Sequence, residues 1–337
     1  PMVARPGSRL LSAGFQAVSD RPFGLSEWAG GGVWAAETVP VIGFYGMGLQ
    51  GWDLSAHFAS GMAGISMDAA GGNVCDQLVN IGQYPAIARA LYRGDIAEGE
   101  IVARRIVSIP AMADNSIGFT EAFSLLGAAN IKDFSSVVPQ AALGAGRVVL
   151  EFVDGPVPNP IQENAGQYLD TRNKTVRSTT GQLFWNYAER GWFTVNTPGT
   201  QAVIGFGGGI DHALADVSIR VENAFANVYI NSLDREKPIR EAKQLVITTM
   251  ARIANQGAVL DELDSAPVAH PKKGAGVPLL IEPVQAKILL KRSGACRVFA
   301  LDHEGRLPAR PVEVPVVKTP EGQEFFLDGA RYKTLYY

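Results

Sequence analysis

Apolar and polar positions follow one pattern up to about residue 105 and another beyond it. In the first part, short apolar runs alternate with segments of helical spacing. PFGLSE (22–27) predicts a buried parallel strand, VWAAETVPVIGFYGM (33–47) a helix and GLQGWD (48–53) a second strand. Further on, apolar positions recur at helical spacing before a terminating Gly94, namely Ile81, Tyr84, Ile87, Ala88 and Leu91. This order of strands and helices is typical of an α/β barrel or a doubly wound sheet.

After residue 105 the helical spacing gives way to short β-rich runs separated by turn residues. Several alternate cleanly, as strands with one buried face do. The runs are GRVVLEFV (146–153), GQLFWNY (181–187), GWFTVNT (191–197), TQAVIGF (200–206), DVSIRVE (216–222), NVYINSL (227–233), QLVITTMARI (244–253), QAKILLKR (285–292) and CRVFALD (296–302). We therefore predict an α/β part over residues 1–105, followed over residues 106–337 by one or two antiparallel β-sandwich domains.

Composition narrows the function classes. The 337 residues carry a formal net charge of −3, which predicts no nucleic-acid partner. No stretch approaches the roughly 18 uninterrupted apolar residues of a spanning helix, so no membrane partner is expected. The two cysteines, Cys75 and Cys296, are too few for a disulfide framework or a cysteine zinc site. We expect neither a metal nor an organic cofactor.

The segment GMGLQG (46–51) matches the glycine pattern of dinucleotide-binding loops. That pattern needs a preceding strand, a following helix and an acidic residue about 20 positions on. Asp68 lies at a tolerable distance, but Trp52 and Asp53 lead into a glycine-rich loop instead of a helix. The glycines are better explained as closing a helix and opening a tightly packed strand.

Glu27 is the first candidate for chemistry. Glycosidic bonds are commonly cleaved by two carboxylates, one of which attacks or stabilises the anomeric carbon while the other donates a proton. In LSEW (25–28), Glu27 ends an apolar strand and precedes Trp28, whose ring offers a sugar-binding surface. The alternative is that Glu27 caps the next helix or pairs with Arg21.

A second group follows the predicted strand 48–53. If that strand is parallel to strand 22–27, their carboxyl ends share one rim of a barrel. Trp52 would then serve as a stacking platform, with Asp53 or His57 binding sugar hydroxyls. A core position for Trp52 and a loop position without a role for His57 are the alternatives.

Three aromatic residues, Trp185, Tyr187 and Trp192, fall in a predicted hairpin of the β-rich part. They would either line an accessory carbohydrate surface or fill a sandwich core, and the core is the interpretation we favour.

Taken together, these segments resemble the C-terminal portion of retaining glycoside hydrolases of the (β/α)₈-barrel clan A. The resemblance rests on RPFGLSEWAG (21–30) as the seventh strand, LQGWD (49–53) as the eighth, and YPAIARALYRGDIAEGEIV (84–102) as the closing helix. The β-rich part, in segments 178–206 and 228–257, resembles domains attached to agarase-like and cellulase-like members. The resemblance implies that Glu27 is the nucleophile and that the ring of Trp52 forms the floor of a sugar-binding subsite.

The resemblance also implies what this sequence lacks. The clan's general acid/base is a glutamate at the end of the fourth strand, which would precede residue 1, and strands one to six are missing. The chain begins PMVARPGSRL, with no signal pattern, like a processed or downstream segment. We therefore expect a second polypeptide carrying the first six strands, and a secreted or periplasmic location. The rival hypothesis is a non-catalytic carbohydrate-binding or structural β-sandwich protein.

Overall fold

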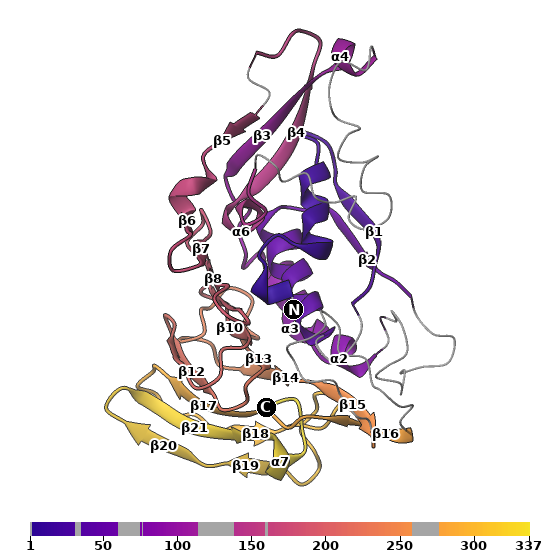
Figure 1. Ribbon diagram of the computed structural model, residues 1–337. Helices are drawn as coiled ribbons and strands as arrows, with labels where there is room; N and C mark the ends of the chain where they lie inside the picture. Colours follow the sequence, from indigo (N-terminus) through magenta and orange to yellow (C-terminus); the bar gives the residue numbers. More distant parts are fainter. Residues whose placement is uncertain are drawn as a thin grey trace.

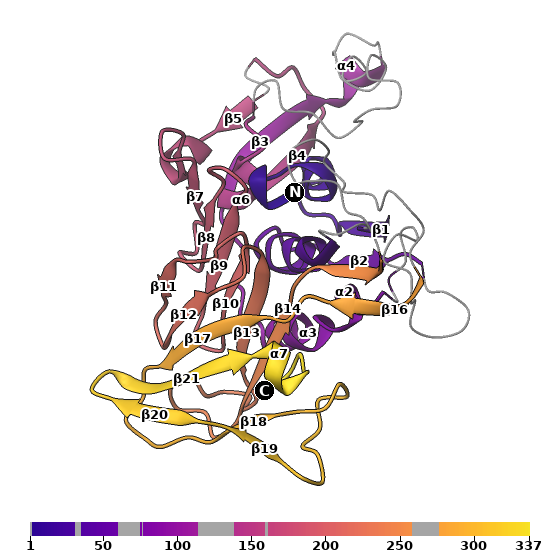
Figure 2. The same cartoon turned by 60° about the horizontal axis from the view of Figure 1, so that its bottom comes forward.

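A computed structural model describes residues 2–30, 35–59, 75, 77–113, 138–158, 161–257 and 276–337. It is a mixed helix-and-strand protein made mostly of sheets, several of them antiparallel. A layer of helices lies between a small parallel sheet, β1–β2, and a large antiparallel sheet (Figure 1). A second antiparallel sheet, yellow and orange in Figure 2, packs on the lower part of the first.

The N-terminal elements supply the helix layer and the parallel sheet. They are η1 (Met2–Ala4), η2 (Arg9–Gln16), β1 (Gly24–Trp28), η3 (Ala35–Glu37), α1 (Thr38–Pro40), η4 (Val41–Leu49), β2 (Leu54–His57), α2 (Leu78–Ile81) and α3 (Tyr84–Arg93). The helix expected over 33–47 is confirmed as one continuous run from η3 through the π-helix η4. Helix α3 ends as expected, because Gly94 adopts the left-handed conformation, with φ +68°.

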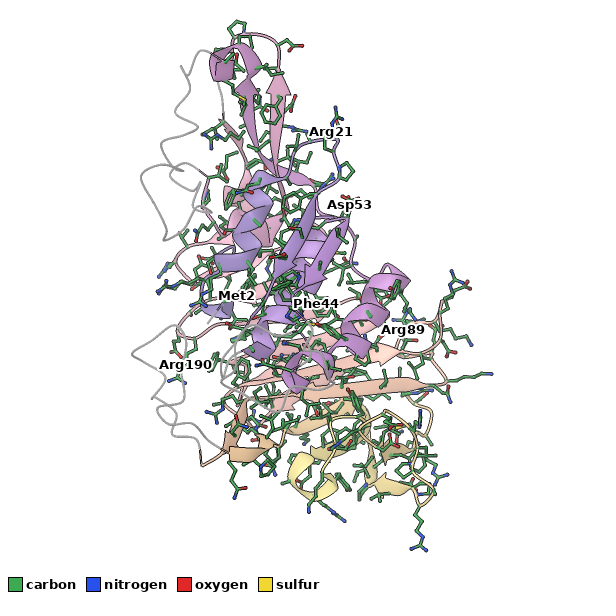
Figure 3. All side chains as sticks on the ribbon, turned by 90° about the vertical axis from the view of Figure 1, so that its right-hand side faces the viewer. Met2, Arg21, Phe44, Asp53, Arg89 and Arg190 are labelled. Atoms are coloured by element: carbon green, nitrogen blue, oxygen red, sulfur yellow. The ribbon has the colours of Figure 1, made fainter. Side chains whose placement is uncertain are left out.

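The continuous helix is apolar on nearly every side, as helices buried within a protein are. Phe44 lies at its centre, between the small sheet and the large one (Figure 3). Pro40 does not interrupt it, and the carbonyl of Ala36, four residues earlier, accepts hydrogen bonds from the side chains of Gln83 and Asn227 in place of the missing N–H.

A three-stranded sheet follows. Its elements are β3 (Ile101–Ser108), α4 (Ile109–Ala113), α6 (Ala142–Ala145), β4 (Arg147–Val153) and β5 (Ile161–Glu163). β3 pairs in parallel with β4 and antiparallel with β5. The boundary expected between residues 105 and 106 therefore falls inside a strand. Hydrophobic residues from both sides of it pack in one core, so the two parts are continuous in the structure.

The large sheet has seven antiparallel strands in the order β14-β13-β10-β9-β8-β7-β6. The strands are β6 (Leu169–Asp170), β7 (Thr175–Arg177), β8 (Leu183–Asn186), β9 (Trp192–Asn196), β10 (Thr200–Gly205), β13 (Ala226–Ser232) and β14 (Leu245–Met250), with η5 (Ala165–Tyr168) leading into them. The expected hairpin of the three distal aromatics is confirmed as β8–β9, with Trp185 opposite Phe193.

The second sheet has five antiparallel strands in the order β11-β12-β17-β21-β20. They are β11 (Asp211–Ala213), β12 (Val217–Val221), β17 (Gln285–Leu290), β21 (Gly322–Asp328) and β20 (Val316–Thr319). Two strand pairs and a short helix complete the fold: β15 (Ile253–Gln256) with β16 (Gly276–Ile281), β18 (Val298–Ala300) with β19 (Val312–Val314), and α7 (Gly329–Tyr332).

The two faces of the large sheet belong to two cores. Side chains such as Trp185 and Phe193 face the helices and join the first core. Val203 and Val228 face the five-stranded sheet and join the second. The second sheet packs on the β10, β13 and β14 side of the large sheet, which makes that part a β-sandwich, and its edge strand β11 reaches β9.

Glu37 anchors the start of the chain to the helix layer. Its carboxylate accepts hydrogen bonds from the backbone N–H of Met2 and of Val3, the latter at 3.1 Å. The Val3 carbonyl in turn accepts from the indole of Trp185 at 2.7 Å. Burial raises the pKa of Glu37, while these hydrogen bonds act in the opposite direction.

The second predicted strand is misplaced. Residues 48–53 form the end of η4 and a turn, and β2 begins only at Leu54. Gly51, at φ +68°, ends the helix. The side chain of Gln50 then bonds the carbonyls of Leu143 and Gly146, at 2.8 and 2.5 Å. These contacts with α6 and its C-terminal end hold residues 48–53 out of an extended conformation. No closed barrel is present in the described ranges.

Candidate functional site

The carboxyl ends of β1 and β2 meet at one edge. The strands run parallel, with Gly24 opposite Leu54 and Trp28 opposite His57, and the buried helix connects them. The register slips by one residue between Leu25 and Trp28, as in a β-bulge. Glu27 lies in this slipped segment and is exposed.

Next to Glu27, Trp28 and His57 form a stacked pair. Their ring centroids are 3.8 Å apart and their planes are inclined by 10°. The Trp28 indole donates a hydrogen bond to Ser55 Oγ at 2.7 Å, and the Trp28 side chain is only 6% exposed. Trp28 is therefore a buried support for the strand end that carries Glu27, and the expectation that its ring offers a sugar-binding surface is corrected, because burial against His57 covers that ring.

Tyr84 of α3 extends this group. Its hydroxyl lies 2.5 Å from His57 Nδ1. Burial lowers the pKa of His57 to about 4, so the imidazole is neutral at physiological pH. Burial also raises the pKa of Tyr84. Sequence reasoning assigned Tyr84 only to the apolar face of a helix, and its partnership with His57 has no local sequence signal.

Trp52 and Asp53 lie at the other ends of these strands. Asp53 precedes β2, and its carboxylate accepts a hydrogen bond from the backbone N–H of Phe23 at 2.9 Å, ahead of β1. Figure 3 shows Asp53 beside Arg21, at the start of β1. The expectation that Trp52 and Asp53 share a rim with Glu27 is therefore corrected, because the helix runs past residue 47 and delays the strand.

Trp52 is a core residue. Its side chain is 3% exposed, and its ring lies 5.3 Å from that of Phe23. The ring also packs against Gly46, where an added Cβ would come within 2.7 Å of it. Trp52 therefore occupies a core position, which was the alternative to its role as a stacking platform.

The glycines of GMGLQG serve close packing. Gly46 and Gly48 lie inside η4, where added Cβ atoms would meet Trp52 and Ile96 at 2.7 and 2.6 Å. A helix precedes Gly51 and a turn and β2 follow it, so the strand-then-helix setting of a dinucleotide loop is missing.

The distal aromatics separate into two groups. Trp185 is fully buried, as favoured for this hairpin, while Trp192 is half-buried on the opposite face of the sheet. Phe184, which sequence reasoning did not single out, accompanies Trp192, with ring centroids 5.6 Å apart. The signal was available in the alternation, since Phe184 is out of phase with Trp185, and Trp192 with Phe193.

The described residues contain no group of three or more His, Cys, Asp or Glu side chains placed to hold a metal ion. Among their helices, none has the length and apolar character needed to cross a membrane.

Comparison with known proteins found no match: no protein-family model, no curated protein and no solved structure matches the chain.

Proposed function

We propose that this chain is the C-terminal part of a retaining glycoside hydrolase built on a (β/α)₈ barrel, with Glu27 as the nucleophile. The observation that carries the proposal is the position of Glu27. It is an exposed carboxylate at the carboxyl end of a parallel strand, beside the end of the next parallel strand, with the connecting helix packed behind both. Active sites of α/β barrels occupy this edge.

In the proposed reaction, a Glu27 carboxylate oxygen attacks the anomeric carbon and displaces the leaving-group oxygen. A second carboxylic acid protonates that oxygen as the bond breaks. Water, deprotonated by the same second group, then hydrolyses the glycosyl ester and releases Glu27. Retention requires the two carboxyl groups to lie about 5–5.5 Å apart.

The second carboxyl group is assigned to strands supplied by an N-terminal portion or a second polypeptide. In the described part of the chain, β1 and β2 pair only with each other. Leu54, the first residue of β2, is 57% exposed, and Phe58, which follows the strand, is 51% exposed. Unpaired strand edges and exposed apolar side chains favour the addition of further strands.

The proposed substrates are β-linked polysaccharides or oligosaccharides, with agar-type galactans first and plant β-glucans second. A polymer of this kind is degraded outside the cytoplasm, so the proposed location is secreted or periplasmic.

The test is labelling with a dinitrophenyl 2-deoxy-2-fluoro-β-glycoside, a substrate that traps the glycosyl-enzyme. Its leaving group departs without protonation, so the label does not require the general acid. The protein is isolated with the chains that copurify with it. We expect label on the peptide containing Glu27, with none in Glu27→Gln. A variant at an exposed turn, Glu321→Gln, should label like the wild type.

Turnover provides the second readout. Release of reducing ends from agarose or β-glucan should fall in Glu27→Gln by a factor on the order of 10³ or more, as when other nucleophiles are removed. Activity in Glu27→Gln equal to that of Glu321→Gln would contradict the assignment.

A further inference from the structure

The outer face of β7, β8 and β9 carries a row of aromatic and guanidinium groups. The Arg177 guanidinium lies over the ring of Phe184, 4.9 Å from its centroid. The Phe184 ring is next to that of Trp192 at 5.6 Å, and Trp192 meets the edge of His212 at 4.6 Å. Strand pairing places the first two opposite each other on adjacent strands, so the row runs across the sheet.

This row belongs to neither core. The strands β7, β8 and β9 contribute Val176, Trp185 and Phe193 to the core beneath the helices. None of their residues belongs to the core between the two sheets. Phe184 and Trp192 therefore stand half-buried on the face opposite the helix layer, and the five-stranded sheet reaches this face at Trp192 through His212 of β11. His212, which is buried, marks the edge where the sandwich begins.

We propose that this face binds a soluble polysaccharide chain. Aromatic rings present a negative face, on which the C–H groups of a pyranose ring pack, and the half-buried Trp192 offers its solvent-facing part for this contact. The hydroxyls of the sugar need hydrogen-bond partners, which the neighbouring polar groups supply. Arg177 is exposed and its guanidinium lies over the Phe184 ring. Asn186, opposite Trp192, binds the Ala188 N–H through Oδ1, which leaves its amide protons as donors.

The geometry of the rings favours a flexible glycan over a flat polymer surface. The planes of Phe184 and Trp192 are inclined by 52°, so a planar surface cannot lie against both. A single chain that turns from one sugar to the next can follow them.

The face is separate from the Glu27 edge. In both Figure 1 and Figure 2, β7 and β8 lie across the helix layer from β1 and β2. Binding here would hold a polymer to the protein without placing a bond at Glu27. The inference stands on its own residues and holds whether or not Glu27 is a nucleophile.

The test is affinity electrophoresis and titration calorimetry of the whole chain with soluble agarose and soluble β-glucan. We expect retardation by at least one of them. Trp192→Ala should weaken the affinity about tenfold, and Arg177→Ala should weaken it several-fold. Arg177 is exposed, so its replacement leaves the fold intact and keeps the test decisive if Trp192→Ala is unstable. The matched control is Phe326→Ala, which removes an aromatic side chain 40% exposed on the other sheet and should bind like the wild type.

Two further arms separate this site from the Glu27 edge and from flat polymers. Glu27→Gln should bind both polysaccharides as the wild type does, and crystalline cellulose should not deplete the protein from solution. Absence of retardation by either soluble polymer, or equal affinities in wild type and Arg177→Ala, would overturn the proposal. So would binding that Glu27→Gln abolishes, since the ligand would then occupy the other edge.

Discussion

Glu27 and Trp28 are neighbours in sequence and occupy opposite environments. Glu27 is exposed, whereas the Trp28 ring is stacked on His57 and bonded to Ser55. A strand alternates its side chains between two faces, and the slip in register changes where each one points. The same few residues therefore combine a free carboxylate with a rigid support.

His57 makes this support sensitive to pH. Its pKa of about 4 in the folded protein lies below the ordinary value of 6.5, so between these values the unfolded chain binds the proton more readily. The stabilisation is complete above pH 6.5 and is lost as the pH falls towards 4. Since His57 is partly exposed, we expect a loss of about 1–2 kcal/mol between pH 7 and pH 4. Urea denaturation at a series of pH values measures it.

The control is the variant that lacks the imidazole. His57→Asn should flatten part of the pH dependence. His212, whose pKa is also lowered by burial, contributes in the same direction and explains a residual slope. Equal slopes in wild type and His57→Asn would contradict the assigned cause.

At the scale of elements, glycines in the buried helix from η3 to η4 allow close packing against neighbouring side chains, and backbone flexibility is not their role. Gly46 and Gly48 allow the helix to touch the ring of Trp52 and the side chain of Ile96. Alanine has the better helix propensity by about 0.5–1 kcal/mol. Overpacking a close contact costs about 1–3 kcal/mol, so the steric effect decides the sign.

Gly46→Ala should therefore lower the free energy of unfolding by about 1–2 kcal/mol, measured by urea denaturation. Gly166→Ala is the control, because no atom lies within 4 Å of its added Cβ. That substitution should change stability by less than about 0.5 kcal/mol. Stabilisation by Gly46→Ala would show that the helix can move away from Trp52.

At the scale of the whole molecule, buried polar contacts join the helix layer to the large sheet. Gln83 accepts hydrogen bonds from Asn227 Nδ2 at 2.7 Å and from the Tyr229 hydroxyl at 2.6 Å. Its amide donates to the carbonyls of Ala36 and Val79. With the shared hydrophobic core, these bonds make the helices and the sheet one cooperative unit.

Thermal or urea unfolding should therefore show one transition for the helix layer and large sheet, coincident by tryptophan fluorescence and far-ultraviolet circular dichroism. Gln83→Ala leaves buried donors and acceptors unpaired and should cost about 3 kcal/mol. Gln162→Ala, at an exposed position of β5, should cost less than about 0.5 kcal/mol. Two separated transitions in the wild type would show that the shared core does not couple them.

Short-range patterns in the sequence determined much of the secondary structure. Short β-rich runs between turn residues predicted β4, β8, β9, β10, β12, β13 and β17. Burial alternates along β8, β12 and β17, whereas β10 and β13 are buried on both faces. Helical spacing and Gly94 predicted α3 and its end. These features depend on residues only a few positions apart, which is the range over which a pattern carries information.

Tertiary structure decided which segments meet. Trp52 is buried against the helix, β2 starts at Leu54, and β3 joins β4 across the intervening chain. His57 acquires its neighbour from α3. Phe184 and Trp192 remain half-buried because they lie at the margin of the second sheet, whose edge strand β11 reaches Trp192 through His212. Each outcome depends on packing between segments far apart in sequence. Local propensity does not indicate which of these segments meet, and burial at their contacts determines the environment of each residue.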